Sequence, residues 1–359
     1  MLRPFVFIVP GASEAGSLEC GESVAILRDL RRKGPVESFL DGAAVLLDAE
    51  AFCVLSPEQA RGAALWVEYH PGLDTVSDED MRAALDRLRP CAEVVLATGH
   101  VDGALDLFRR PVRPSALALK SAEAAGVGSS ETAGLLLDHA RRVLGPDRPP
   151  LVLWGGVATP EAAAAFLATG AGAVVLEQAH RLTDAGGLSE TTAQRLRKLK
   201  HESGAAISAD GPLQWRFFDK GNSRAVRRLR ETAASDPRAL AAEIRRAAVA
   251  LEDSTLGPDE LIPFGADAPF AAGFAERFGE RAAPALRAFA EEALRLWEEA
   301  PARLERFRSR AAQDGPGSRL PLIQGAMSWI SDSPAFARAV AEAGALPTLA
   351  AGPRAHADL

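Results

Sequence analysis

Short apolar runs alternate along the first half of this chain with segments whose apolar residues recur at helical spacing. Runs of this length, bounded by Gly, Pro or charged residues, predict buried strands. The run near residue 24 fits a helix equally well, because Arg28–Lys33 follow it. Strands alternating with helices predict an α/β fold with a parallel sheet, and eight of them predict a TIM (β/α)8 barrel. The eight predicted strands begin near residues 5, 24, 43, 64, 92, 115, 151 and 173.

The clearest strand–helix–strand unit covers residues 151–178. Leu151–Trp154 is a strand-like run, and Gly155 and Gly156 follow it. Thr159-Pro160-Glu161 is a helix start, and Ala173–Leu176 is the next strand. Two glycines at the end of a parallel strand let backbone N–H groups approach a ligand, and this end of a barrel commonly binds phosphate. The alternative is that the two glycines only make a tight turn.

The chain divides by pattern into three parts: a barrel over 1–180, a helical extension and linker over 181–317, and a further α/β segment over 318–359. In the extension, Trp215–Phe218 is interpreted as an apolar anchor on the barrel. Residues 318–359 have the order strand, helix, strand, which predicts the first unit of a second, truncated barrel. We therefore expect the chain to be a fragment of a longer polypeptide. The predicted helices of the extension are Thr191–Lys200, Asn222–Arg230, Pro237–Ala250, Pro269–Arg277 and Ala282–Arg310.

Charge and cysteine content narrow the class of protein. The formal net charge is −7, and no basic cluster is interleaved with aromatic residues, which argues against a nucleic-acid partner. Cys20, Cys53 and Cys91 lie far apart and show no metal-ligand spacing, so we expect no metal site and a reducing, cytoplasmic setting. The apolar run at the N-terminus is too short for a signal peptide, and no membrane span is predicted.

Two stretches resemble a known family. LPLIQGAMSWISDSPAFARAVAEAGALPTLA (320–350) resembles the opening of the nitronate monooxygenase, or 2-nitropropane dioxygenase, family of FMN-binding TIM barrels, with Ala326 where the family usually has Pro. SALALKSAEAAG (115–126) and residues 151–178 resemble strands six to eight of the same family. A degenerate barrel followed by a barrel that is closer to the family pattern resembles the tandem modules of large type I polyketide or polyunsaturated-fatty-acid-type synthases.

The resemblance implies FMN as cofactor and a set of residues that contact it. Gly155 and Gly156 would offer N–H groups to the FMN phosphate, and Glu177 and Gln178 lie where the family has its second phosphate-contacting turn. A carboxylate at position 177 would repel that phosphate. Further flavin contacts are implied at Gly126, Gln324, Gly325 and Met327.

The resemblance also bears on catalysis. Lys120 ends the sixth strand, where it would pair with the phosphate or a flavin oxygen; the alternative is a lysine at the barrel rim. Val127 stands where the family has its catalytic His, and Val cannot accept a proton. Glu123 is the replacement base to consider, although a loop carboxylate is more often a helix cap. His70 and His100 follow predicted strands without a partner visible in the sequence, which favours a structural or solvated role.

Three functions remain open. The first is an FMN-dependent oxidoreductase module of nitronate monooxygenase or enoyl reductase type, acting on a small-molecule or acyl-carrier-bound substrate. The second is a catalytically inactive barrel that serves as a structural or docking module for other domains of a larger synthase; Val127 and Glu177 favour it for residues 1–180. The third is a phosphate-binding lyase or isomerase without flavin, which needs a Lys or a carboxylate pair on several strand ends.

Overall fold

The computed structural model describes residues 3–10, 22–31, 44–199, 203–208, 211–232, 237–314, 320, 322–327, 331 and 333–349. By contacts the chain forms two compact units, Met1–Leu294 and Arg295–Leu359. No helix among the described residues is both long enough and apolar enough to cross a membrane.

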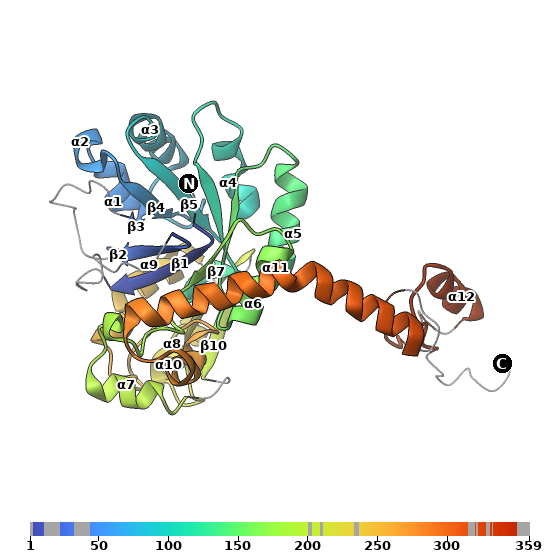
Figure 1. The fold of residues 1–359 in the computed structure, drawn as a ribbon. Helices are drawn as coiled ribbons and strands as arrows, with labels where there is room; N and C mark the ends of the chain where they lie inside the picture. The colour runs from blue at the N-terminus through green and yellow to red at the C-terminus, as the bar shows by residue number, and fades with distance from the viewer. Residues whose placement is uncertain are drawn as a thin grey trace. The chain divides into compact units, whose positions relative to one another are not determined.

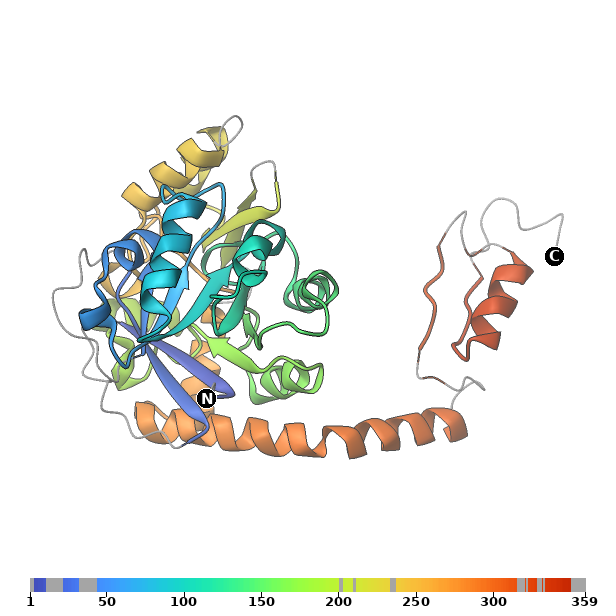
Figure 2. The same cartoon turned by 90° about the horizontal axis from the view of Figure 1, so that it is seen from above.

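The first unit is a closed barrel of parallel strands, which confirms the predicted TIM-barrel fold (Figures 1 and 2). Strand β1 pairs with β2 on one side and with β9 on the other, which closes the ring. Residues near 24 form a strand, so the helical alternative for that run was wrong. Within the described residues the barrel strands are β1 (Phe5–Pro10), β2 (Val24–Asp29), β3 (Ala44–Asp48), β4 (Ala64–Glu68), β5 (Glu93–Thr98), β6 (Ala116–Lys120), β8 (Leu151–Trp154) and β9 (Ala173–Leu176).

Helices connect the strands around the outside of the barrel. The Ser77 side chain caps the helix that begins at Asp78 by accepting the N–H of Asp80. The apolar face of this helix buries Met81 and Leu88. Thr159 caps another by accepting the N–H of Ala162. These helices are α1 (Ala49–Val54), α2 (Pro57–Ala60), α3 (Asp78–Leu88), α4 (Val101–Phe108), α5 (Ala133–Leu144) and α6 (Pro160–Ala168).

Side-chain alternation along the strands creates two apolar layers. On β1, Val6 and Ile8 belong to the cluster inside the barrel, whereas Phe5 and Phe7 belong to the cluster between strands and helices. Successive residues of a strand point to opposite faces, so a run buried on both faces is apolar throughout. This is why unbroken apolar runs marked the strands.

The extension after residue 180 contains a sheet as well as helices, which corrects the expectation of a helical segment. Strands β10 (Gly204–Ser208) and β11 (Leu213–Phe218) form an antiparallel hairpin, and β11 also pairs with β7 (Gly126–Ser129). Trp215 and Phe217 are buried on one face of β11, whereas Arg216 between them is only partly buried. The aromatic anchor is therefore a strand, and it ties the extension to the loop after β6.

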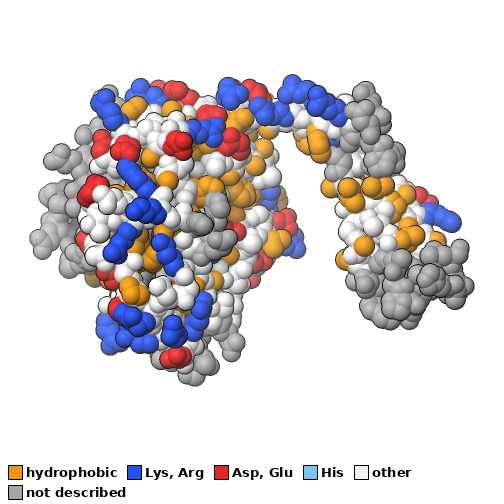
Figure 3. Space-filling view, turned by 90° about the horizontal axis from the view of Figure 1, so that it is seen from below, with side chains coloured by type: hydrophobic (Ala, Val, Ile, Leu, Met, Phe, Trp, Pro, Cys, Tyr) orange, Lys and Arg blue, Asp and Glu red, His pale blue; other side chains and the backbone are white. Residues whose placement is uncertain are grey.

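Helices complete the extension. They are α7 (Glu190–Leu196), α8 (Arg224–Thr232), α9 (Pro237–Ala247), α10 (Ala271–Phe278) and α11 (Ala282–Asp314). Phe289 of α11 packs on the barrel, with its ring centroid 6.3 Å from that of Phe5 and 5.8 Å from that of Phe7. Its ring also stacks on Phe274 of α10, at 5.7 Å between centroids. Lys and Arg side chains gather on the face drawn in Figure 3, despite the negative net charge.

The second unit contains helix α12 (Pro334–Glu342) between two extended segments. Ile323 and Leu346 form a parallel bridge, and Leu346 exchanges backbone hydrogen bonds with Gln324 and Leu322 at 2.8 Å each. The side chains of Leu322 and Ile323 are exposed within this unit. Residues 350–359 lie outside the described part, and the second barrel stays a prediction.

Candidate ligand site at the barrel mouth

A cavity of about 910 Å³ lies at the carboxyl ends of the barrel strands, the end at which TIM-barrel sites are built. Its volume is within the roughly 300–1,000 Å³ of small-molecule pockets. Polar side chains at the ends of strands β2 and β4 and just after β2 and β9 form the floor, and apolar residues of β11 and α9 form a wall. Those residues are Asp29, Arg31, Glu68, Glu177 and Gln178 on the floor, and Trp215, Phe217, Ala241 and Ile244 on the wall.

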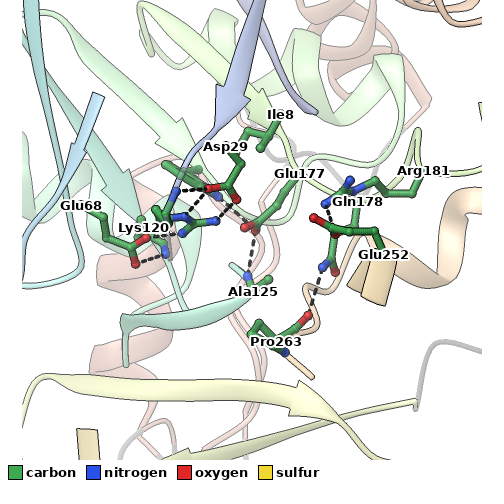
Figure 4. A network of polar contacts seen from close by, with 12 residues as sticks. Ile8, Asp29, Glu68, Lys120, Ala125, Glu177, Gln178, Arg181, Glu252 and Pro263 are labelled. Atoms are coloured by element: carbon green, nitrogen blue, oxygen red, sulfur yellow. Dashed lines mark hydrogen bonds and ion pairs between the residues drawn. The ribbon is translucent and has the colours of Figure 1, made fainter. Parts of the chain in front are cut away.

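Ion pairs fill the floor of this cavity (Figure 4). Arg31 donates to both carboxylate oxygens of Asp29, at 2.9 Å and 2.6 Å, and also pairs with Glu68. Lys120 donates to Oε1 of Glu68 at 2.5 Å. Burial would raise the pKa of Glu68, but the charges of Lys120 and Arg31 outweigh burial and hold its pKa well below the usual range. The neighbouring cations therefore hold Asp29 and Glu68 as carboxylates, because the pKa of each lies below its usual range.

Lys120 stands at the end of β6, as the sequence predicts, but it does not face the cavity. Its side chain is 0% exposed, and its Nζ lies 4.8 Å from the ring centroid of Trp154. A lysine held between a carboxylate and an indole face is paired and desolvated. The arrangement suits a structural cation better than a group that contacts a ligand.

Both histidines that follow strands have partners that the sequence did not reveal. His70 is buried, its Nε2 lies 3.3 Å from Glu68 Oε1, and its Nδ1 lies 3.3 Å from the backbone N of Gly99. That N–H donates to Nδ1, so the proton of a neutral His70 ring is on Nε2. His100 begins α4, and its Nδ1 lies 3.4 Å from the carbonyl oxygen of Pro71.

The predicted phosphate site at Gly155 and Gly156 is covered by the loop after β6. A Cβ at Gly155 would lie 2.5 Å from Ser121 Oγ and 2.6 Å from the backbone N of Ala124. A Cβ at Gly156 would lie 3.5 Å from the side chain of Glu123. Neither glycine is among the described residues that line the cavity. Both glycines have positive φ, 110° and 74°, as a tight turn requires, and their phosphate role stays a prediction.

The second predicted phosphate contact, after β9, is occupied by the chain's own carboxylates. Glu177 Oε2 accepts the backbone N–H of Ala125 at 2.9 Å and the indole N–H of Trp154 at 3.0 Å. Asp267 accepts the N–H groups of Glu177, Gln178 and Ala179. A phosphate placed here would meet two carboxylates and no free donor among these groups. The residues present do not fit the FMN phosphate.

Asp267 was missed by the sequence analysis. It lies just before a 3-10 turn at Ala268–Phe270, far along the chain from its partners, and no local pattern marks it. Its side chain is buried, and burial together with the charge of Glu177 raises its pKa to about 6 although three N–H groups favour the charged form. The charge of Glu177 therefore acts on the buried Asp267 carboxyl at the edge of the barrel.

The other predicted site residues divide between the cavity and other positions. Gly126 and Gln178 line the cavity with Glu177. Val127 also lines it from β7, where it pairs with Trp215 and packs against the apolar cluster of the extension. Glu123 accepts the N–H of Ala133 at 3.1 Å, the helix-cap role that was weighed against catalysis. Gln324, Gly325 and Met327 belong to the second unit. The described residues include no group of three potential metal ligands.

Comparisons with known proteins bear on the fold. No protein-family model matches the chain, and no curated protein matches it. Among the solved structures, FabK from Thermotoga maritima is similar over 85% of this chain and 96% of its own, with 15% identity and a TM-score of 0.51. The enoyl reductase domain of MlnA from the macrolactin biosynthesis cluster of Bacillus amyloliquefaciens is similar over 84% of this chain and 95% of its own, with 10% identity and a TM-score of 0.56. Nitroalkane oxidase from Streptomyces ansochromogenes is similar over 82% of this chain and 97% of its own, with 17% identity and a TM-score of 0.52.

At these identities the likeness shows the fold. The chain is a TIM-barrel protein, and its fold is similar to that of these three structures. This agrees with the fold that the resemblance implied, whereas the tandem synthase arrangement stays a prediction.

Proposed function

We propose that residues 1–294 form a barrel of the flavin-oxidoreductase type that no longer binds FMN and serves as a structural or docking module for other domains of a larger synthase. The observation that carries this proposal is the carboxylate of Glu177, which takes the N–H groups of Ala125 and Trp154 where the resemblance places a phosphate contact. The fold likeness to the MlnA enoyl reductase domain supports the larger context. A cytoplasmic setting is part of this proposal.

The catalytic positions support the same conclusion. Val127 replaces the proton-accepting histidine and packs against apolar residues of the extension. Lys120 is fully buried and bonded to Glu68, so it does not contact a molecule in the cavity. Lys120 and Glu68 also stand at two strand ends, as the site of a phosphate-binding lyase or isomerase would need. A buried lysine without access to the cavity does not serve lyase or isomerase chemistry, however.

A second candidate, an FMN-dependent oxidoreductase acting on a small-molecule or acyl-carrier-bound substrate, is favoured by the cavity of about 910 Å³. In that case flavin would supply the redox chemistry, and the cavity would orient the substrate. The phosphate of such a flavin would bind away from Gly155 and Gly156.

Titration of the full chain with FMN and with riboflavin separates the two candidates. Flavin fluorescence and the visible absorbance bands report binding. We expect neither flavin to bind with a Kd below about 1 mM. Saturable FMN binding with a Kd near 10 μM or tighter would refute the proposal, and a preference for FMN over riboflavin would show a phosphate site that the carboxylates do not block.

A further inference from the structure

We propose that the backbone N–H groups of Glu177, Gln178 and Ala179 form an oxyanion-binding nest whose internal ligand is the carboxylate of Asp267. The nest takes a small oxyanion, such as formate or inorganic phosphate, only when that carboxylate is removed. This inference rests on the proposed function, since it explains how the barrel keeps an anion-binding turn and yet excludes a phosphate-bearing cofactor.

The geometry is that of an anion site. A single oxygen, Oδ2 of Asp267, accepts three successive N–H groups, at 3.2 Å from Glu177, 2.6 Å from Gln178 and 3.0 Å from Ala179. Consecutive N–H groups that converge on one point form a concave site for an anion. Asp267 is 3% exposed, so its carboxylate fills the nest and leaves no room there for an ion from the buffer.

Hydrogen bonds on both sides hold the segment that carries Asp267. The N–H of Gly265 donates to Gln178 Oε1 at 2.8 Å, and Gln178 Nε2 donates to the carbonyl of Pro263 at 3.0 Å. The N–H of Ala266 donates to the carbonyl of Glu123 at 2.8 Å. A Cβ at position 265 would lie 2.5 Å from Asp267 Oδ1, so glycine is needed there. Residues 263–267 are therefore shaped to deliver a carboxylate into the nest.

Glu177 makes the nest a poor host for any further anion. Its own carboxylate lies close enough to Asp267 to raise the pKa of that group, and it would repel a bound phosphate in the same way. Gln at position 177 keeps an oxygen that can accept from Ala125 and Trp154 but removes this charge. Neutralising Glu177 should therefore strengthen anion binding once Asp267 is truncated.

The test is thermal unfolding of the full chain in formate, in inorganic phosphate and in chloride of equal ionic strength. Asp267→Ala empties the nest, whereas Asp267→Asn is the matched control because its amide oxygen still accepts the three N–H groups. We expect formate or phosphate to raise the Tm of Asp267→Ala by at least about 2 °C over chloride, and to raise that of Glu177→Gln/Asp267→Ala further. Wild type and Asp267→Asn should not respond.

A folded Asp267→Ala protein that gains nothing from either anion would overturn the nest, and so would an equal gain in wild type. Hydrogen exchange of the peptide 173–182 keeps the proposal testable if the alanine variants do not fold. Slow exchange of the amides at 177–179 in wild type and Asp267→Asn supports the nest, and exchange at the rate of unbonded loop amides overturns it. FMN binding by wild type would refute the proposed function but would change neither the anion dependence of the Tm nor the hydrogen exchange of residues 177–179.

Discussion

The buried carboxylate of Asp267 should make the stability of the first unit depend on pH in an unusual direction. Its pKa is raised from 3.8 to about 6, largely by burial and then by the charge of Glu177. The rise of about two pKa units corresponds to about 3 kcal/mol at 1.36 kcal/mol per unit. Because the folded pKa lies above the unfolded one, the stabilising contribution is fully present below about pH 4 and is lost as the pH rises through about 6.

The assay is urea unfolding of wild type and Asp267→Asn at intervals between pH 4 and pH 8, followed by tryptophan fluorescence. We expect the unfolding free energy of wild type to fall relative to Asp267→Asn by about 2 kcal/mol between pH 4 and pH 7, because the unfolded carboxyl is already partly ionised at pH 4. Asn cannot ionise, so its own profile lacks this component. Glu177→Gln should reduce the fall, because it removes the second cause of the raised pKa. Parallel profiles for wild type and Asp267→Asn would refute the electrostatic reasoning.

Three further substitutions test the packing around the site. Lys120→Met should cost about 3–5 kcal/mol of unfolding free energy, since it leaves Glu68 buried with one cation fewer. The double variant Lys120→Met/Glu68→Gln should recover part of that loss. A double variant that loses as much stability as Lys120→Met alone would contradict the pairing. Gly155→Ala should cost on the order of 3 kcal/mol of unfolding free energy, because its Cβ would clash with the loop after β6. Gly156→Ala should cost only about 1–2 kcal/mol, from backbone strain alone. Thermal melts in which Gly156→Ala is the less stable variant would contradict the clash at Gly155. Phe289→Ala should cost about 3–5 kcal/mol in urea unfolding, and a loss below 1 kcal/mol would exclude it from the core.

The barrel could be predicted from the sequence because each of its strands is a local signal. A strand buried on both faces is an apolar run, and no information from elsewhere in the chain is needed to recognise it. Strand β7 gives no such signal, since Gly126–Ser129 contains only one apolar side chain larger than a methyl group. Strand β11 does alternate, with Leu213, Trp215 and Phe217 on one face, so its pattern could have indicated a strand.

The site was less predictable because its contacts join distant parts of the chain. The sequence placed Lys120 and Glu177 at strand ends and identified the carboxylate at 177 as incompatible with phosphate. It could not supply Glu68 as the partner of Lys120, or Asp267 as the ligand of the turn after β9, because neither pairing has a local pattern. The structure thus gives a reason for the unexpected carboxylate: it is a hydrogen-bond acceptor for Ala125 and Trp154.

The contact of Phe289 with the first strand constrains when the barrel can mature during synthesis. The outward rings of Phe5 and Phe7 emerge from the ribosome first, yet the aromatic ring that covers them is encoded near the end of the first unit. A nascent chain that stops at residue 180 holds every barrel strand but leaves this apolar surface in water. We therefore expect a chain that ends there to aggregate more readily than one that includes Phe289.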